Sequence, residues 1–387
     1  MLNDVKIAGG AMTPFNRRKD GSSFRDWSRT AVSGALKDAS LEPRDIDMLV
    51  VASESDFFTL QLNPAALLAD ECGLFGVAAQ RAEGGGASGH VAFHAGVAAL
   101  AGGMAKRVLV LGVEPSASHL KGADVGALYA LSFDAWTDGM TGVDATSLYA
   151  LSAQMFMQRT GAKHADFAQI AVRNRQNAGL NPYAHLPLDV SIDDVVSSTL
   201  VAAPYHRLDC SPLSDGAAAL ILARAKDLPQ NGQTRASVKG LGNSTDRVRL
   251  GERSDPGYFA GKREASRRAF SMAGVEVTDI GLAEVYDSYS GAQLQALEAL
   301  GLVEDVVAAE RSGMFAADGA MPVNLSGGLL GQGAPVGATG VAQVIAAALQ
   351  LEGRYWGLRP AKAARFALVD THGGIATLNT VSILEAP

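Results

Sequence analysis

The sequence contains very little cysteine and no long apolar run. Only Cys72 and Cys210 occur among 387 residues, which is too few for a disulfide framework or a cysteine-based zinc site. No uninterrupted apolar segment approaches the ~20 residues that span a bilayer. The opening residues Met-Leu-Asn-Asp-Val-Lys lack the apolar core of a secretory signal. These absences predict a cytoplasmic protein without a membrane segment.

The sequence also lacks any block of one charge. Acidic residues number 40 and basic residues 33, for a net charge of −7, so nucleic acid is not an expected partner. A phosphate-bearing ligand would have to be held by local basic groups or helix N-termini. Hydrophobic residues make up 48% and charged residues 19%, which excludes disorder. A globular chain of this length favours two domains or one duplicated architecture.

Glycine, by contrast, is abundant and clustered. The 43 glycines gather at 84–89, 327–340 and 373–374. Because glycine permits tight backbone turns and close approach of a ligand, these clusters predict functional loops.

The chain carries an internal repeat. An offset of 234 pairs residues 30–53 with 264–287, and seven of those 24 positions are identical: Ala31/Ala265, Ala35/Ala269, Ala39/Ala273, Glu42/Glu276, Asp45/Asp279, Ile46/Ile280 and Val51/Val285. The alanine pairs are spaced by four, which predicts one closely packed helix face. An apolar strand follows each helix, at 48–51 and 282–285. A glycine-rich turn, an alanine-rich helix and a second strand then follow in both halves, ending at 108–111 and 366–369.

A segment that lies between the repeated units of the first half and those of the second matches neither half. Residues 116–200 are rich in aromatic, methionine and polar residues, as expected of an inserted loop domain that contacts the substrate. We therefore predict an N-terminal half at 1–115 plus 201–232, the loop domain at 116–200, and a C-terminal half at 233–387.

Several blocks together carry a family resemblance: residues 83–89 (EGGGASG), 110–114 (VLGVE), 174–178 (NRQNA), 214–218 (SDGAA), 324–328 (NLSGG), 333–340 (GAPVGATG) and 373–374. With them the whole chain resembles the thiolase superfamily, particularly its sterol-carrier-protein branch of lipid metabolism. The resemblance implies an α/β thiolase fold, in which two βαβαβαββ halves form an αβαβα layered core. It also implies a homodimer and chemistry on CoA thioesters.

The nucleophile of that family is missing here. Gly86 takes the position of the cysteine that attacks the thioester, and the family's Gly-His-Pro turn has Ala334 in place of the histidine. An acyl-enzyme is therefore not expected. Neither Cys72 nor Cys210 matches a catalytic position, and we predict both to be small buried residues.

Other side chains remain at the catalytic loops. Tyr286 replaces the Asn or His of the second loop, and His372 lies beside Thr371, which takes the position of a second cysteine. Tyrosine and histidine both exchange protons. Tyr289 is a further candidate, although each of the three side chains would also suit a packing role. Asp287 is expected to cap the next helix.

Backbone groups and the CoA contacts complete the predicted site. By resemblance, the N–H groups of Gly86 and Gly374 stabilise a thioester oxyanion, and Ser326, Gly327 and Gly328 contact CoA. His90 and His94 have metal-ligand spacing, but no third ligand is evident. We read them as helix-face or interface residues and expect no metal and no cofactor besides the CoA thioester.

Three functions stay open. The first is retro-aldol cleavage of a β-hydroxyacyl-CoA, with His372 as base and Tyr286 as acid. It rests on a resemblance to the thiolase-like retro-aldolases of steroid side-chain degradation, which lack the cysteine and work with a small partner carrying a zinc ribbon and an OB-fold. The second is a non-covalent thiolase or acetyl-CoA acetyltransferase activity. The third is a catalytically silent, acyl-CoA-binding scaffold.

Overall fold

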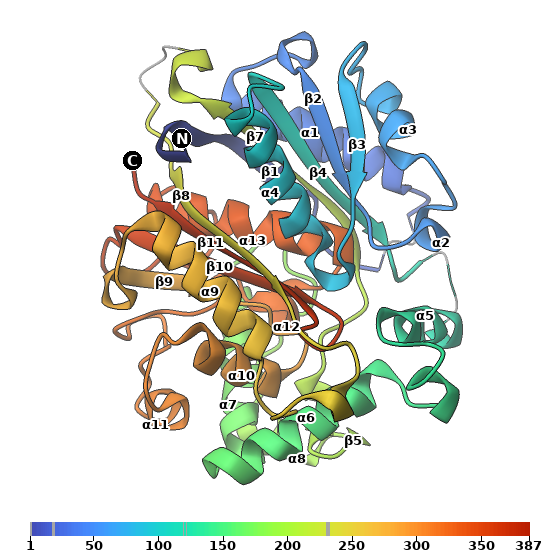
Figure 1. Cartoon of the computed structure of the whole chain (residues 1–387), viewed down its shortest axis with the longest axis vertical. Coiled ribbons are helices and arrows are strands. Elements are labelled where there is room, and N and C mark those ends of the chain that lie inside the picture. Colours follow the sequence, from blue (N-terminus) through green and yellow to red (C-terminus); the bar gives the residue numbers. More distant parts are fainter. Residues whose placement is uncertain (1, 18–19, 119, 121, 230–232) are drawn as a thin grey trace.

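A computed structural model describes residues 2–17, 20–118, 120, 122–229 and 233–387 (Figure 1). The predicted end of the N-terminal half, at 232, lies outside these residues. One mixed sheet of nine strands runs through the molecule in the order β3-β2-β4-β7-β1-β8-β11-β10-β9. Its first five strands belong to the N-terminal half of the chain (the N-half) and its last four to the C-terminal half (the C-half).

The N-half alternates strands and helices. Its elements are β1 (Val5–Met12), α1 (Phe24–Ala39), β2 (Met48–Ala52), α2 (Asp56–Thr59), α3 (Pro64–Glu71), β3 (Ala78–Ala82), α4 (Ser88–Ala101), β4 (Arg107–Pro115) and β7 (Asp215–Arg224). Strand β2 is parallel to both β3 and β4, whereas β7 is antiparallel to β4 and β1.

The C-half repeats this plan. It contains β8 (Ser237–Thr245), α9 (Ala260–Ala273), β9 (Ile280–Glu284), α10 (Ser290–Leu300), α11 (Val306–Arg311), α12 (Gly328–Gln332), α13 (Val336–Leu351), β10 (Phe366–Gly373) and β11 (Leu378–Glu385). The order β9-β10-β11-β8 matches β2-β4-β7-β1 of the N-half. A parallel bridge between Ala283 and Val323 stands where the N-half has β3.

The layers follow from the helix contacts. Helices α4 and α13 pack on each other, and α13 touches β4 of the N-half and β10 of the C-half, so this pair lies between the two parts of the sheet. Helix α1 covers β1 and β7 from outside, and α9 covers β8 and β11. The predicted αβαβα arrangement of two duplicated halves is confirmed.

The repeated alanines explain how closely the outer helices approach. A Cβ added at Gly9 of β1 would lie 2.7 Å from the backbone N of Ala39, and one at Gly240 of β8 would lie 2.2 Å from the carbonyl O of Ala269. Small residues on both surfaces are therefore required, because any larger side chain would push helix and strand apart. This contact recurs in the two halves, which is why the alanine spacing survives in both.

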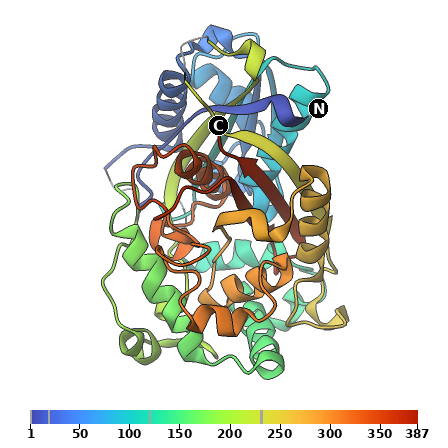
Figure 2. The same ribbon diagram turned by 90° about the vertical axis from the view of Figure 1, so that its left-hand side faces the viewer.

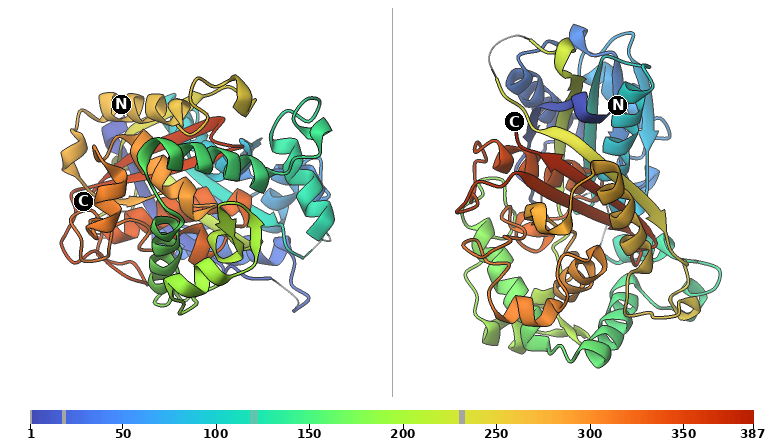
Figure 3. Two further views of the ribbon diagram at one scale, coloured as in Figure 1. Left: turned by 90° about the horizontal axis from the view of Figure 1, so that it is seen from below. Right: turned by 60° about the vertical axis from the view of Figure 1, so that its left-hand side comes forward.

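Between β4 and β7 the chain forms a mostly helical segment. It contains α5 (Gly122–Tyr129), α6 (Ala145–Thr160), α7 (His164–Ala178), α8 (Ile192–Ser197), and the short antiparallel pair β5 (Leu200–Ala202) and β6 (Tyr205–His206). Figures 1 and 3 show this green segment at one end of the molecule, and Figure 2 shows both chain termini away from it. None of the described helices is long and apolar enough to cross a membrane.

Short 3-10 turns link these elements: η1 (Leu2–Asp4), η2 (Pro43–Asp45), η3 (Gly85–Ala87), η4 (Ala130–Ser132), η5 (Gly139–Thr141), η6 (Arg207–Asp209), η7 (Ala225–Asp227), η8 (Leu250–Glu252) and η9 (Val277–Asp279).

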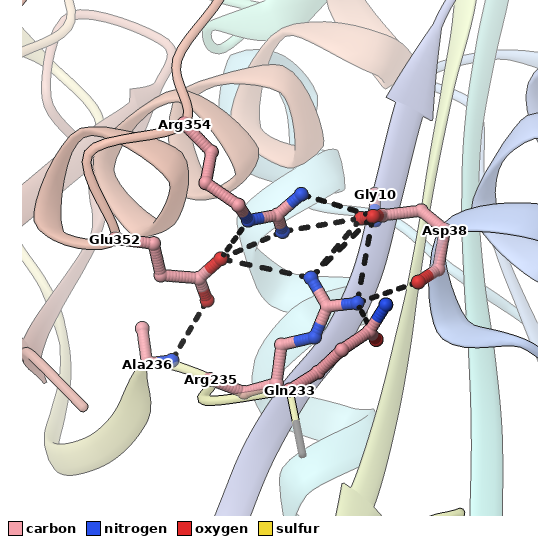
Figure 4. A network of polar contacts seen from close by, with 7 residues as sticks. All are labelled: Gly10, Asp38, Gln233, Arg235, Ala236, Glu352 and Arg354. Atoms are coloured by element: carbon pink, nitrogen blue, oxygen red, sulfur yellow. Dashed lines mark hydrogen bonds and ion pairs between the residues drawn. The ribbon is translucent and has the colours of Figure 1, made fainter. Parts of the chain in front are cut away.

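A charged network joins the two halves (Figure 4). Asp38 of α1 accepts the Gly10 N–H at 3.0 Å and a bond from Arg354 at 3.0 Å. Arg354 also donates to Glu352, just past α13, at 2.6 Å, and Arg235 lies 3.6 Å from the same carboxylate. Two carboxylates and two guanidinium groups thus connect α1 of the N-half to the end of α13 of the C-half.

Candidate active site

A cavity of about 380 Å³ lies where the loops after β2, β3 and β9 and the end of β10 meet helices α5 and α6. Its wall includes five residues predicted to act in catalysis: Gly86, Tyr286, Tyr289, His372 and Gly374. Residues from 86 to 374 in the sequence therefore meet at one place. Their catalytic roles stay predictions.

Tyr286 fills the space beside Gly86. A Cβ built on Gly86 would lie 2.5 Å from the Tyr286 hydroxyl oxygen and 2.5 Å from the carbonyl O of His372. Both distances are too short for a carbon atom, and the carbonyl belongs to the backbone of β10. The place where the family's nucleophile would begin is thus occupied, and only glycine fits.

The Tyr286 phenol is a proton donor at neutral pH. Its side chain is buried, which raises its pKa well above the usual 10, so the hydroxyl stays protonated. The ring packs on that of His372, with 4.7 Å between centroids. Behind it, the Tyr286 N–H donates to Asp370 at 3.4 Å, and Asp370 forms a fully buried ion pair with Lys262.

His372 is a neutral imidazole held by Tyr149 of α6. Its Nε2 lies 2.8 Å from the Tyr149 hydroxyl, which donates its one proton to the Gly374 carbonyl at 2.6 Å. Nε2 must then carry the imidazole proton, which leaves Nδ1 as the acceptor. Nδ1 has no hydrogen-bond partner in the described part of the chain. Burial holds the His372 pKa well below 6.5, so the ring is uncharged.

The two predicted oxyanion donors are uncommitted. Across the described residues, neither the Gly86 N–H nor the Gly374 N–H donates to a protein acceptor. Their turns are adjacent, since the Gly374 nitrogen lies 3.6 Å from a Cβ built on Gly85. Gly374 has φ +58°, which favours glycine. Free N–H groups at a cavity wall are what stabilisation of a thioester enolate requires.

Comparison with known proteins agrees with this arrangement. Residues 5–226 match the thiolase N-terminal domain, and residues 242–386 match the thiolase C-terminal domain-like family. The chain belongs to the thiolase superfamily.

Relatives of this thiolase-fold chain differ in what they do. An acetyl-CoA acetyltransferase of Methanothermobacter thermautotrophicus is 36% identical over 99% of this chain and 100% of its own. Human sterol carrier protein 2 is 28% identical over 96% of this chain and 70% of its own. A solved structure described as the Ltp2-ChsH2(DUF35) aldolase superposes with a TM-score of 0.83 at 26% identity, covering 99% of this chain and 98% of that one. The predicted membership, with relatives in the sterol-carrier and aldolase branches, is confirmed.

Glu54 is a cavity residue that the sequence reading missed. It follows β2, is half-buried, and accepts a hydrogen bond from the Ser132 hydroxyl at 3.3 Å. Burial raises the pKa of Glu54 to about 7. Neighbouring Glu114 is fully buried; burial, with the Glu54 charge adding to it, raises its pKa to about 8. Tyr149 also lines the cavity and was missed, and neither residue lies in a block that carries the family resemblance.

The predicted CoA contacts lie elsewhere. Ser326 donates its hydroxyl to Glu284 at 2.6 Å, and the Gly328 N–H donates to the Ser326 hydroxyl oxygen at 3.2 Å. Gly327 packs against Ala178 of α7. All three are buried behind the cavity wall and do not line it, so contact with CoA stays a prediction for them.

The cysteines differ from expectation. Both are only partly buried, and Cys210 reaches the cavity wall because the chain from 207 to 213 folds over it. The Cys210 thiol donates to the His206 carbonyl at 3.4 Å, and burial raises its pKa to about 12. It is a thiol, not a thiolate, at neutral pH. Burial likewise raises the pKa of Cys72, at the end of α3, to about 11.

Asp287 caps a helix, though not the one expected. Its carboxylate accepts the N–H groups of Leu329 and Leu330 at 2.6 and 3.3 Å, so it caps α12 instead of the next helix, α10. Side chains of α12 are thereby fixed beside the cavity.

His90 and His94 both face one serine. Their Nε2 atoms lie 2.7 and 2.9 Å from the Ser382 hydroxyl of β11. No cluster of three metal-binding side chains occurs among the residues that the structure describes.

Proposed function

We propose that this protein cleaves the Cα–Cβ bond of a β-hydroxyacyl-CoA by a retro-aldol reaction, without an acyl-enzyme. The observation that carries the proposal is the Tyr286 hydroxyl, which stands where a nucleophile at Gly86 would begin. A retro-aldol step needs no nucleophile. It needs a proton acceptor at the β-hydroxyl, stabilisation of the enolate, and a proton for the α-carbon.

The cavity supplies the first two of these needs. The His372 Nδ1 accepts the β-hydroxyl proton, and the electrons of the Cα–Cβ bond move into the thioester to form an enolate. The Gly86 and Gly374 N–H groups stabilise the enolate oxygen. Loss of one such donor typically raises the activation energy by ~3 kcal/mol. The Tyr286 hydroxyl donates a hydrogen bond to the oxygen that becomes the product carbonyl. The products are an aldehyde or ketone and a shortened acyl-CoA.

The structural likeness to an aldolase complex supports this reaction and suggests an assembly. That aldolase is described with a DUF35 component. We extend the proposal to a small zinc-ribbon and OB-fold partner for this chain, and to a homodimer of the chain itself.

An acyltransferase is the second candidate, because the 36% identical relative is an acetyl-CoA acetyltransferase. That reaction would have to proceed without a covalent intermediate here, since no side chain fits at Gly86 and the Cys210 thiol is protonated. The geometry therefore favours the lyase. A silent acyl-CoA-binding scaffold is the third candidate.

The test is a product analysis. The purified protein, alone and with a DUF35-type subunit from the same organism, is incubated with 3-hydroxyacyl-CoA and 3-oxoacyl-CoA substrates of several chain lengths. Aldehyde or ketone plus shortened acyl-CoA supports the lyase. CoA-dependent cleavage of the 3-oxo substrates would instead establish the transferase, and binding without turnover would establish the scaffold.

Two variants of similar chemistry sharpen the test. Tyr286→Phe removes the hydroxyl over Gly86 and is expected to lower kcat about 100-fold. Tyr289→Phe removes a hydroxyl whose partner is Thr146, at 2.8 Å, and is expected to lower kcat less than fivefold. Equal activity in both variants would refute the role of Tyr286.

A further inference from the structure

Glu54 and Tyr286 lie in the loops that follow β2 and β9, which are corresponding strands of the two halves. Each lies two residues past the last residue of its strand, β2 ending at Ala52 and β9 at Glu284. Both side chains reach the catalytic cavity. The loops after these two strands therefore each bring a titratable side chain to the cavity.

The Glu54 main chain is fixed while its carboxyl group is nearly free. Its N–H donates to Glu114 at 2.6 Å, and its carbonyl accepts from Arg81 at 3.3 Å. Of its carboxyl oxygens, Oε1 accepts the Ser132 hydroxyl and Oε2 is buried without a partner among the described residues. Buried carboxylates of purely structural type are fully hydrogen-bonded, as Glu284 is by Ser326 and Gln350. Glu54 does not fit that type.

Glu54 also separates two cavities. It lines the catalytic cavity and a second one of about 350 Å³, which lies beyond the glycine turns and also contacts Gly85 and Gly373. Its Oε1 is 3.9 Å from a Cβ built on Gly85. A carboxyl group at this boundary can contact the substrate in the catalytic cavity and exchange protons with water in the second cavity.

Burial is the main cause that favours the protonated form of Glu54, and the charge of Glu83 adds to it. Groups that interact with it electrostatically are Glu83, Glu114, Tyr129, Tyr149 and Tyr286. The Arg81 guanidinium contacts the Glu54 carbonyl but pairs with Asp56, and no described Lys, Arg or His forms an ion pair with the Glu54 carboxyl group. Burial and the charge of Glu83 raise its pKa to about 7, where both forms are populated at neutral pH.

We propose that Glu54 is the catalytic acid that protonates the α-carbon of the thioester enolate. The inference rests on the proposed function for its place in the reaction. The Glu54 O–H bond breaks, a C–H bond forms at the α-carbon with the electron pair of the enolate, and the thioester carbonyl is restored. Water in the second cavity then returns a proton to Glu54, and the His372 imidazolium releases one to water, so no net proton is gained or lost.

The reverse of this step is measurable without any aldol substrate. The Glu54 carboxylate should remove an α-proton from acetyl-CoA or propionyl-CoA, so the wild-type protein in D₂O is expected to exchange α-hydrogen for deuterium, followed by mass spectrometry. Exchange needs the carboxylate and therefore rises with pH through a midpoint near 7, whereas cleavage needs the acid and falls over the same interval.

Three variants test the assignment. Glu54→Gln is expected to lose exchange about 100-fold, and Glu54→Asp, which keeps a carboxyl group, to recover part of it; thermal unfolding of both checks that they fold. Glu83→Gln, outside the catalytic cavity, should keep exchange and move the midpoint to lower pH, because one neighbouring negative charge is removed.

The outcomes separate this inference from the proposed function. Exchange by the wild-type protein without cleavage of any 3-hydroxyacyl-CoA would leave Glu54 as the acid and refute the retro-aldol proposal. Cleavage that persists at the wild-type rate in Glu54→Gln would refute the role of Glu54 alone. Absence of exchange in a wild-type protein that binds propionyl-CoA would also overturn the assignment.

Discussion

The two halves of this molecule share one fold but contribute to the cavity in opposite ways. The N-half offers a bare glycine turn at Gly86 and one carboxyl group, Glu54, whereas the C-half offers the ring side chains of Tyr286 and His372. The ring of one half fills the volume beside the glycine of the other. The absence of a cysteine at Gly86 therefore leaves no empty space in the site, because the Tyr286 side chain occupies that volume.

The halves differ again in how they handle a buried carboxyl group. Strand β10 of the C-half places Asp370 against Lys262, and both side chains are fully buried. Strand β4 of the N-half places Glu114 among the Ser53 hydroxyl and the N–H groups of Glu54 and Gly337, with no cation in contact among the described residues. The C-half neutralises the charge of Asp370 with Lys262, whereas the N-half keeps the carboxyl group of Glu114 protonated.

The largest expected effect comes from breaking the C-half pair. Asp370→Asn leaves Lys262 charged and buried without a counter-charge, which typically costs 3–5 kcal/mol, so the free energy of unfolding should fall by about 3 kcal/mol or more. Urea denaturation at pH 7 measures it. The double variant Lys262→Met with Asp370→Asn serves as control and should regain much of the loss. If the free energy of unfolding of Asp370→Asn falls by less than about 1 kcal/mol, Lys262 does not depend on the Asp370 charge in the folded protein.

The second prediction concerns the glycine turn of the N-half. Gly86→Ala places a methyl group 2.5 Å from the His372 carbonyl and the Tyr286 hydroxyl, so the turn must shift and the oxyanion donor moves with it. We expect kcat/KM to fall about 100-fold, or ~3 kcal/mol of activation energy. Gly251→Ala is the matched control, because a Cβ there meets nothing within 4 Å. Gly86→Cys should be equally impaired and form no acyl-enzyme, and a trapped thioester in that variant would contradict the steric argument.

The fold could be predicted from sequence because its signals are local. Alanines at spacing four record the contact of α1 and α9 with glycines of β1 and β8, and the repeated Asp-Ile before each strand records a shared turn. The glycine clusters likewise marked the turns at Gly86 and Gly374, since only glycine takes those backbone positions without a clash.

The rest of the site depends on tertiary contacts that leave no local pattern. Tyr149 reaches His372 only because α6 docks against the end of β10. Glu54 lies in a Ser-Glu-Ser-Asp stretch that resembles any surface turn. Ser326 lies in a family motif, yet its side chain turns toward Glu284, because one bond rotation decides which side of a loop a serine faces.

A third prediction uses the pH dependence of Glu114. Its folded pKa of about 8 exceeds the usual 4.5, so the folded state holds the proton more tightly, and stability is lost as pH rises from about 4.5 to 8. Glu114→Gln mimics the protonated acid. It should match the wild type near pH 4.5 and exceed it by roughly 4 kcal/mol at pH 8, with little further divergence above. Urea denaturation at pH 5 and pH 8 measures this, and a destabilised variant at pH 8 would show that Glu114 is ionised in the folded state.

The smallest expected effect tests where the halves are the same. Asp45 accepts the Glu42 N–H at 2.8 Å at the start of η2, and Asp279 accepts the Glu276 N–H at 2.9 Å at the start of η9. The Glu and Asp residues that repeat in the sequence therefore form the same capping box in both halves. Each bond is exposed, so Asp45→Ala and Asp279→Ala should each lower the free energy of unfolding by about 0.5–1 kcal/mol. Because the sites are far apart, the double variant should lose the sum of the two. If the losses of the two single variants differ by more than about 1 kcal/mol, the two halves share the turn but not its contribution to stability. The contribution of Asp45 would then depend on a neighbour such as Arg107, which donates to the Asp45 carbonyl at 3.4 Å.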